Sequence, residues 1–460
     1  MTSTWSSRHA LRSGSRCRAC QRRHFRSSTM TRKIRAAAAI ALIGATALVA
    51  SGCSAGSDAS EDGGKVTMTF WHNSTTGPGK AYWASTVKAF EEKYPNVTIK
   101  TQAIQNEDLD GKLQTALNSG DAPDVFLQRG GGKMDAMIAA GQLMDISDSI
   151  SADAKKSISA GTFAGYEKDG KTYAMPGAVL PEGIWYSKDL FKEAGIEGTP
   201  TTMDELNDAI TKLKAKDIDP VAVGAKDAWP AAHWYYNFAL RECSQKTLED
   251  TAKSLKFDNA CWTKAGEQLE DFNATKPFNN GFLTTAAQQG AGSSAGLLAN
   301  HKAAMELMGA WDPGVIASLT PDAKPLPDLG WFPFPAIDGG KGDPKSMMGG
   351  VDGNSCSAQA PKKACTDFLN FIVQKDNQEG YYKAFNAIPV NKEAQSVVDS
   401  DYLKTALAAY QEAPFVSQYL DTLYGQNVGN ALNTSVVDLL ADKGSAKDIV
   451  ETTNQAAAKG

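Results

Sequence analysis

The chain has 460 residues, of which 42% are hydrophobic and 22% are charged. After residue 53 it carries 37 Lys or Arg against 52 Asp or Glu, a formal charge of −15, and an acidic surface of this kind excludes nucleic acid as an expected partner. The roughly 400 residues beyond the leader are too many for one ordinary core and predict two domains.

The first 53 residues have the composition of a targeting segment. They contain no Asp or Glu, and the apolar run from Ala36 to Ala50 is too short to span a bilayer comfortably but suits a signal peptide. The run ends in "LVASGC", which resembles a bacterial lipoprotein signal with Cys53 as the lipidated residue. The resemblance implies a leader over 1–53, a flexible tether over 54–64 and lipid anchoring to the cell membrane outside the cytoplasm; the alternative is a plain secretory signal.

Two features of the leader need a separate interpretation. Met30 begins a complete signal by itself, so residues 1–29 are possible upstream sequence that is not translated. The "CRAC" stretch from Cys17 to Cys20 has no second cysteine or histidine pair at ligand spacing after it. We therefore predict no metal site there, and no cofactor for the chain.

The elements that follow the tether alternate between strand and helix. "KVTMTFWH" has strand alternation, "AYWASTVKAFEEKYP" has helical spacing, "NVTIKTQAI" is a second strand, and "LDGKLQTALNSGDAPDVFLQ" repeats helix, turn and strand. This order predicts an α/β fold with a parallel sheet. Ligands collect at the carboxyl ends of such strands, which places 71–73 and 127–132 in ligand-facing loops. The glycine run there lacks the Lys and Ser/Thr of a phosphate cradle and predicts a close backbone turn.

Large rings are concentrated between Asp227 and Phe238. If Pro230 opens a helix, one face carries Trp229, His233 and Tyr236 and another carries Trp234 and Phe238. One helix cannot bury both faces equally unless it lies between two layers or borders a cleft. Packing is the expected role of Trp234, Tyr235 and Phe238.

The second half of the chain contains capping signals and cysteines. Capping boxes are predicted at Thr202 to Glu205 and at Ser445 to Asp448. The four cysteines after residue 53 allow three disulfide pairings. We favour the local one, which joins Cys243 to Cys261 and Cys356 to Cys365.

Eight stretches occur in an order and spacing that identify a family: "TFWH", "FEEKYPNVTI", "SGDAPDVF", "AAGQLMDIS", "DGKTYAMPGAVLPEGIWYSKDLFKEAGI", "PTTMDEL", "MELMGAWDPG" and "FNAIPVNK". The chain resembles the extracellular solute-binding proteins of family 1, the sugar-binding components of ABC importers. The resemblance implies a type II periplasmic-binding fold, in which two α/β lobes joined at a hinge enclose the ligand in a cleft. One lobe would take 62–177 plus 354–400, and the other 178–353 plus 401–460. Ser187 stands where the family has Asn or Asp, and we expect a structural role for it.

The resemblance also implies which residues meet the ligand. A sugar-binding site needs planar polar side chains around the edge of the sugar ring and aromatic side chains against its faces. The expected ligand-binding residues are Trp71, His72, Gln128, Arg129, Glu182, Lys226, Asp227, Trp229, His233, Trp311 and Asp352. Glu182 is the weaker choice, and Trp71 has packing over the sheet as its alternative role. The expected partners are a mono- or oligosaccharide and the membrane permease subunits of the importer, with the chain itself a monomer.

Two other functions compete with sugar capture. A surface glycosidase would need two carboxyl groups at a defined separation, and the chain has no G-x-S-x-G motif and no histidine pair at metal spacing. We therefore expect no enzyme activity. The same fold with a polyamine, iron or an amino acid as ligand is the second alternative, and the tryptophans favour a carbohydrate over these.

Overall fold

A computed structural model describes residues 64–459 of the chain. The leader, Cys53 and residues 54–63 of the tether lie outside the described residues, so the predictions made for them stay predictions. Within 64–459, no helix combines the length and the apolar character that a membrane crossing requires.

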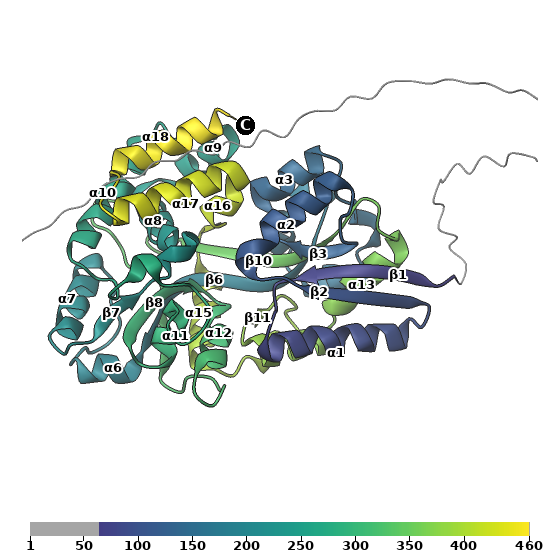
Figure 1. Ribbon diagram of the computed structural model, residues 1–460, viewed down its shortest axis with the longest axis horizontal. Helices are drawn as coiled ribbons and strands as arrows, with labels where there is room; N and C mark the ends of the chain where they lie inside the picture. Colours follow the sequence, from purple (N-terminus) through teal and green to yellow (C-terminus); the bar gives the residue numbers. More distant parts are fainter. Residues whose placement is uncertain (1–63, 460) are drawn as a thin grey trace, which may run out of the picture. The chain divides into compact units, whose positions relative to one another are not determined.

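The first elements follow the predicted alternation of strands and helices. They are β1 (Val66–His72), α1 (Gly77–Lys93), β2 (Val97–Ala103), α2 (Asn106–Ser119), β3 (Val125–Gln128) and α3 (Gly131–Ala139). β1 pairs in parallel with both β2 and β3, which confirms the α/β fold and the parallel pairing of these strands, although the complete sheet is mixed. α1 lies on one face of these strands, and α2 and α3 lie on the other (Figure 1).

The remaining strands extend this sheet across the molecule. They are β6 (Met175–Ser187), β7 (Asp219–Ala222), β8 (Ala303–Gly309), β9 (Leu329–Phe332), β10 (Met347–Cys356), β11 (Ile388–Pro389) and β12 (Val416–Ser417), with β4 (Glu167–Lys168) and β5 (Lys171–Thr172) in a separate hairpin. The order is β2-β1-β3-β10-β6-β8-β7, with β9 and β11 on β6 and β12 on β10. The long antiparallel strands β6 and β10 therefore join the β1–β3 end of the sheet to the β7–β8 end.

Helices cover the sheet along its whole length. Those after α3 are α4 (Ala152–Ser157), α5 (Ala160–Ala164), α6 (Lys188–Glu193), α7 (Met203–Lys214), α8 (Trp229–Glu242), α9 (Gln245–Ser254), α10 (Ala260–Ala274), α11 (Ser294–Ala299), α12 (Asp312–Leu319), α13 (Lys362–Ile372), α14 (Lys375–Phe385), α15 (Asp401–Glu412), α16 (Leu420–Leu423), α17 (Gln426–Leu440) and α18 (Ala446–Ala457). α8, α10, α17 and α18 form one layer over the β8 end of the sheet (Figure 1).

Two large hydrophobic cores hold these layers. One includes Phe70 on β1 and Phe90 on α1, whose rings each contact the ring of Phe368 on α13 edge to face. The other is built around α8, where Trp234 and Phe238 pack against rings of neighbouring elements. Burial of large rings on both sides of β6 and β10 fixes the sheet between its helices.

Local signals in the sequence produce the expected helix starts. Thr202 and Ser445 each accept a hydrogen bond from the backbone three residues on, in complete capping boxes that begin α7 and α18. The Ser187 hydroxyl accepts a hydrogen bond from the backbone N–H of Leu190 at the start of α6 and contacts Asp328. Ser187 is therefore a structural residue, as predicted.

The cysteines pair locally. Disulfides join Cys243 to Cys261 and Cys356 to Cys365, which confirms the favoured pairing. The first connects the end of α8 to α10, and the second connects the end of β10 to α13.

The glycine run after β3 forms the predicted close turn. Gly130 and Gly131 have φ of 75° and 59°, in the left-handed region that glycine adopts without strain. A Cβ on Gly131 would lie 2.8 Å from the carbonyl oxygen of Thr422, and one on Gly132 would lie 2.8 Å from that of Leu423. The run therefore lets α3 approach α16 closely.

Candidate ligand-binding site

An aromatic cluster gathers beside the point where β6 leaves β10 for β8. Its rings belong to Trp229 and His233 on α8, Trp311 after β8, and Tyr419 before α16. Ring centroids are 6.2 Å apart for Trp229 and Trp311, and 5.7 Å apart for Trp311 and Tyr419. The His233 and Tyr419 rings stack at 4.7 Å with 12° between their planes. Trp229 and Trp311 are partly exposed and also pack against the core that contains Phe70, so this cluster lies between that core and the solvent.

The other side of α8 has the packing role that the sequence predicted. Trp234, Tyr235 and Phe238 are all buried. Trp234 stacks on Phe272 at 4.8 Å, and the Tyr235 hydroxyl donates to the carbonyl oxygen of Trp262. One helix therefore serves a core with one face and the aromatic cluster with another.

A buried polar group lies beneath the cluster. His233 Nδ1 is in ion-pair contact with one carboxylate oxygen of Glu182, and Asn237 Nδ2 donates to the other at 2.7 Å. All three side chains are nearly inaccessible. Both oxygens of Glu182 are therefore engaged within the protein, on the first residue of β6 that pairs with β8.

A second polar group surrounds Arg129 at the end of β3. Its guanidinium donates to Asp110 at 3.1 Å and to Asn106 at 2.7 Å, and approaches Asp352 at 3.8 Å. Lys133 also binds Asp110, at 2.8 Å. Burial by itself would raise the pKa of the Asp110 carboxyl, but Arg129 and Lys133 hold that pKa below its usual value, so Asp110 is ionised. Asp110 thereby fixes the guanidinium at the carboxyl edge of the sheet.

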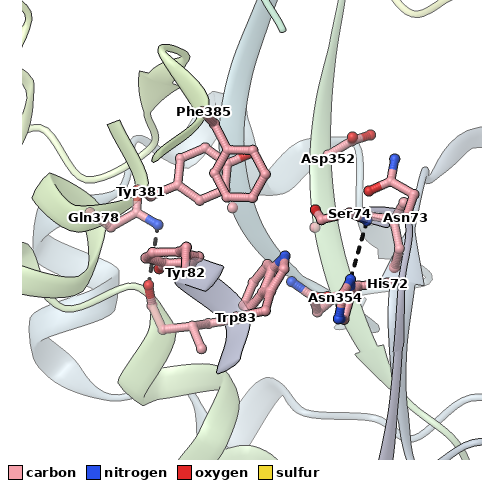
Figure 2. Close-up of a pocket in the computed structure, with 14 residues that line it drawn as sticks. His72, Asn73, Ser74, Tyr82, Trp83, Asp352, Asn354, Gln378, Tyr381 and Phe385 are labelled. Atoms are coloured by element: carbon pink, nitrogen blue, oxygen red, sulfur yellow. Dashed lines mark hydrogen bonds between the residues drawn. The ribbon is translucent and has the colours of Figure 1, made fainter. Parts of the chain in front are cut away.

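A cavity of about 40 Å³ opens next to this group, between β1, β10, α1 and α14. Figure 2 shows aromatic side chains on one side of it and polar ones on the other. The aromatic side is formed by Tyr82, Trp83, Tyr381 and Phe385, and the polar side by His72, Asn73, Ser74, Asp352 and Asn354. The Asn354 side chain is 4% exposed, and its Oδ1 has no hydrogen-bond partner among the described residues.

His72 brings a defined donor to this cavity. Burial, with a smaller contribution from the Lys80 ammonium, lowers the pKa of His72 to about 4, so the ring is neutral at pH 7. The backbone N–H of Ser74 donates to Nδ1 at 3.2 Å. The proton of the neutral ring is therefore on Nε2.

One short segment joins the aromatic cluster to the Arg129 group. Gln418 Nε2 donates to the carbonyl oxygen of Arg129 at 3.3 Å, while the adjacent Tyr419 stacks on His233. The Tyr419 hydroxyl donates to the carbonyl oxygen of Leu180 at 3.3 Å. The structure thus brings seven of the expected residues to the region around the paired strands β6 and β10: Trp229, His233, Trp311, Glu182, Arg129, Asp352 and His72.

The remaining residues predicted to bind the ligand have contacts within the protein or are exposed at the surface. Gln128 is buried and its Oε1 accepts the backbone N–H groups of Arg129 and Gly130. Asp227 accepts the backbone N–H of Ala287 at 2.7 Å, and Lys226 is exposed. Trp71 packs against a small satellite core, which was its alternative role.

Sequence reasoning missed several residues that line these groups. Tyr419 lies in a stretch without a local ligand signal. Tyr381 and Phe385 are four residues apart on α14, and Tyr82 and Trp83 follow the Gly and Pro break after β1. The only signal in the sequence that could have indicated these residues was the occurrence of aromatic residues at helical spacing or close to the end of a strand.

One group of potential metal ligands occurs among residues 64–459. Side-chain atoms of Asp189, His301 and Asp328 lie within 4.8 Å of one another. His301 Nε2 is 3.0 Å from both carboxylate oxygens of Asp328. Asp328 also contacts Ser187 at the start of α6, so the group is explained by pairing within the protein.

The fold and this region define a class of protein. A long mixed sheet, with helices on both faces and with aromatic and polar groups beside its two long central strands, has the type II periplasmic-binding fold of solute-binding proteins. Residues 72–379 match the profile of the bacterial extracellular solute-binding proteins, and the chain belongs to that family.

Known proteins resemble most of the chain. An uncharacterized ABC transporter extracellular-binding protein of Pyrococcus horikoshii is 26% identical over 89% of this chain and 92% of its own length. The diacetylchitobiose-binding protein DasA of Streptomyces coelicolor is 26% identical over 77% of this chain and 82% of its own length. A solved chitin oligosaccharide binding protein is 25% identical, with a TM-score of 0.79 over 86% of this chain and 99% of that one.

Proposed function

We propose that the chain is the extracellular carbohydrate-binding component of an ABC import system, which captures a sugar or oligosaccharide and delivers it to membrane permeases. The observation that carries this proposal is the partly exposed indole pair Trp229 and Trp311, with His233 beside it. Indole faces match the C–H faces of sugar rings, and a histidine serves ring-edge hydroxyls. The names of relatives support the ligand class, since they bind diacetylchitobiose, chitin oligosaccharide and arabinooligosaccharide.

The ligand would lie between two lobes. We assign 62–177 plus 354–400 to the first and 178–353 plus 401–460 to the second. Strand pairing supports a crossing here, because Pro181 on β6 pairs with β10 while the next residue, Glu182, pairs with β8. His72, Arg129 and Asp352 would then serve the ligand from the first lobe or the crossing, and Trp229, His233 and Trp311 from the second. The full ligand set proposed from the sequence also includes Trp71, Gln128, Glu182, Lys226 and Asp227.

Binding without chemistry is part of the proposal. Burial and the neighbouring Asp312 raise the pKa of Glu306 well above its usual value, and burial raises the pKa of Asp312 to about 7. The two carboxyl groups are 1% and 0% exposed, so neither can reach a glycosidic bond in a solute. This pair therefore does not supply the two carboxyl groups that a glycosidase needs.

Localisation completes the proposal. The chain would be secreted as a monomer and held at the membrane surface by lipid on Cys53. Cys53→Ala is expected to release the protein from membranes into the medium or periplasm, measured by fractionation and immunoblot. A variant that stays fully membrane-bound would place the anchor elsewhere.

A thermal-shift screen across mono- and oligosaccharides tests the function. A ligand present at 100 times its Kd adds about 2.7 kcal/mol to the free energy of unfolding, enough to raise the melting temperature measurably. We expect at least one saccharide to do so. Stabilisation by polyamines, iron or amino acids alone would contradict the carbohydrate assignment, and release of shorter products from a labelled oligosaccharide would contradict binding without chemistry.

A further inference from the structure

We propose that Glu182 is a positioning residue, whose carboxylate fixes the proton and the orientation of His233 so that one ring nitrogen is presented to the ligand. This rests on the proposed function, because it concerns the same site. It gives Glu182 a role through His233 in place of direct contact with a sugar.

Each carboxylate oxygen of Glu182 lies against a polar atom of α8, one in an ion-pair contact and the other as a hydrogen-bond acceptor. One contacts His233 Nδ1, and the other accepts a hydrogen bond from Asn237 Nδ2 at 2.7 Å. The Asn237 amide is itself held by a second bond, to the carbonyl oxygen of His233 at 3.0 Å. The Glu182 side chain has no exposed surface and that of His233 is 3% exposed. A solute therefore cannot reach Glu182 without breaking this group.

The imidazole is held on its other sides by rings. Tyr419 stacks on one face at 4.7 Å, and Trp229 lies at 5.1 Å. Tyr419 is anchored to the carbonyl oxygen of Leu180, two residues before Glu182 on β6. The strand therefore holds His233 twice, once through Glu182 and once through Tyr419. Nε2 has no hydrogen-bond partner among the described residues, which leaves it for a ligand.

The chemistry of a carboxylate decides which nitrogen carries the proton. An ionised carboxylate only accepts, so the nitrogen that faces it has to be protonated. The close contact with Glu182 therefore favours a proton on Nδ1 of His233, and the ring in that form offers the Nε2 lone pair to a ligand hydroxyl. His72 has the opposite arrangement, because a backbone N–H occupies its Nδ1. The site would thus contain one histidine that accepts and one that donates.

Glu182→Gln tests the inference with little change in shape. The Gln oxygen can still accept from Asn237, which turns its amide N–H groups toward His233 and makes Nδ1 the acceptor. Ring ¹⁵N chemical shifts of labelled histidine, with His233 assigned through His233→Gln, should show the proton moving from Nδ1 to Nε2. The matched control is Glu242→Gln. Glu242 is a buried acid on α8, the helix of His233, but it accepts a hydrogen bond from Gln268 rather than contacting His233. The control should leave the His233 shifts unchanged.

Affinity provides the second measurement. Calorimetry with a saccharide found in the thermal screen should show Glu182→Gln binding about tenfold more weakly than the wild type, and Glu242→Gln binding like the wild type. The weakening should disappear when Glu182→Gln is introduced into His233→Gln, because Glu182 would act only through that ring. Unchanged ring shifts in Glu182→Gln would overturn the inference, and so would moved shifts with full affinity. If the wild type binds no saccharide, the proposed function fails, while the ring shifts still support or overturn the control of His233 by Glu182.

Discussion

Trp311 is the residue whose substitution should distinguish an effect on ligand affinity from an effect on stability most clearly. It follows the last residue of β8 by two positions and precedes α12, so its indole lies at the edge of the sheet. A Cβ on Gly309 would lie 2.0 Å from the indole, so the missing side chain at that position makes room for the ring. The indole is partly exposed beside Trp229 and Tyr419.

Trp311→Ala is therefore expected to cost affinity more than stability. We expect sugar binding to weaken by about 1 to 3 kcal/mol, roughly tenfold to more than a hundredfold, as for loss of one aromatic contact. The melting temperature without ligand should change little. Calorimetric affinity and melting of the ligand-free variant measure the two effects separately. A core tryptophan would show the reverse, a loss of about 3 to 5 kcal/mol in stability with affinity retained.

The buried pair Glu306 and Asp312 predicts a dependence of stability on pH. Burial raises both pKa values, to about 7 for Asp312, so the folded chain holds a proton that the unfolded chain releases near pH 4. At Asp312 the folded state thus binds more protons between about pH 4 and 7, so the contribution of this group to stability falls as pH rises through that range. Below pH 4 both states are protonated and the contribution is constant.

Asp312→Asn should flatten this dependence. Urea unfolding at pH 5 and pH 8 is expected to show a loss in the wild type of roughly 1 to 3 kcal/mol from this pair, and a smaller loss in the variant. Asp208→Asn removes an exposed acid on α7 and serves as the control, with the wild-type dependence retained. Equal pH dependence in Asp312→Asn and the wild type would contradict the raised pKa of Asp312.

Among the elements, α8 packs into a hydrophobic core with one face and contributes to the aromatic cluster with another. Trp234→Ala removes a ring that is 1% exposed and stacked on Phe272, so we expect a loss of about 3 to 5 kcal/mol in the free energy of unfolding. Trp229→Ala, five residues earlier, removes a partly exposed ring and should leave most of the stability. Chemical unfolding of the two variants compares the faces directly. Similar losses in both would show that the whole helix serves the core.

The elements themselves were predictable from the sequence because their signals are local. Strand alternation in β1 and β2, the capping boxes of α7 and α18, and Pro230 at the start of α8 each act within a few residues. Disulfide pairing was predictable for the same reason, since each bond closes a short loop.

The site was predictable only in part because it is assembled from distant segments. Tyr419 meets His233 and Leu180 across 186 and 239 positions of sequence, and no local pattern marks it. The role of polar residues near strand ends was also ambiguous, because such residues can bind a ligand or accept hydrogen bonds from the backbone. Gln128 and Asp227 have polar side chains suited to a sugar. Each instead accepts a hydrogen bond from a backbone N–H group, which cannot be predicted from the sequence.

At the scale of the whole molecule, the account requires the proposed lobes to move. β6 and β10 are the long strands shared by both ends of the sheet, and Gln289 reaches from the second lobe to Gln105 and Glu107 in the first, at 2.9 and 3.4 Å. A ligand that binds the closed state better shifts the population toward it. Small-angle scattering should show a smaller radius of gyration at saturating sugar, and an unchanged radius would count against closure.

Capture of a saccharide without chemistry is the central claim, and a calorimetric titration of the wild-type chain tests it most directly. The titrants are the saccharides from the thermal screen, followed by a polyamine and free amino acids as non-sugar solutes. The account predicts saturable binding of a saccharide at one site per chain, with no heat from the other solutes at the same concentrations. Binding of a polyamine or amino acid with no saccharide response would contradict it, as would a continuous heat of turnover after each saccharide injection.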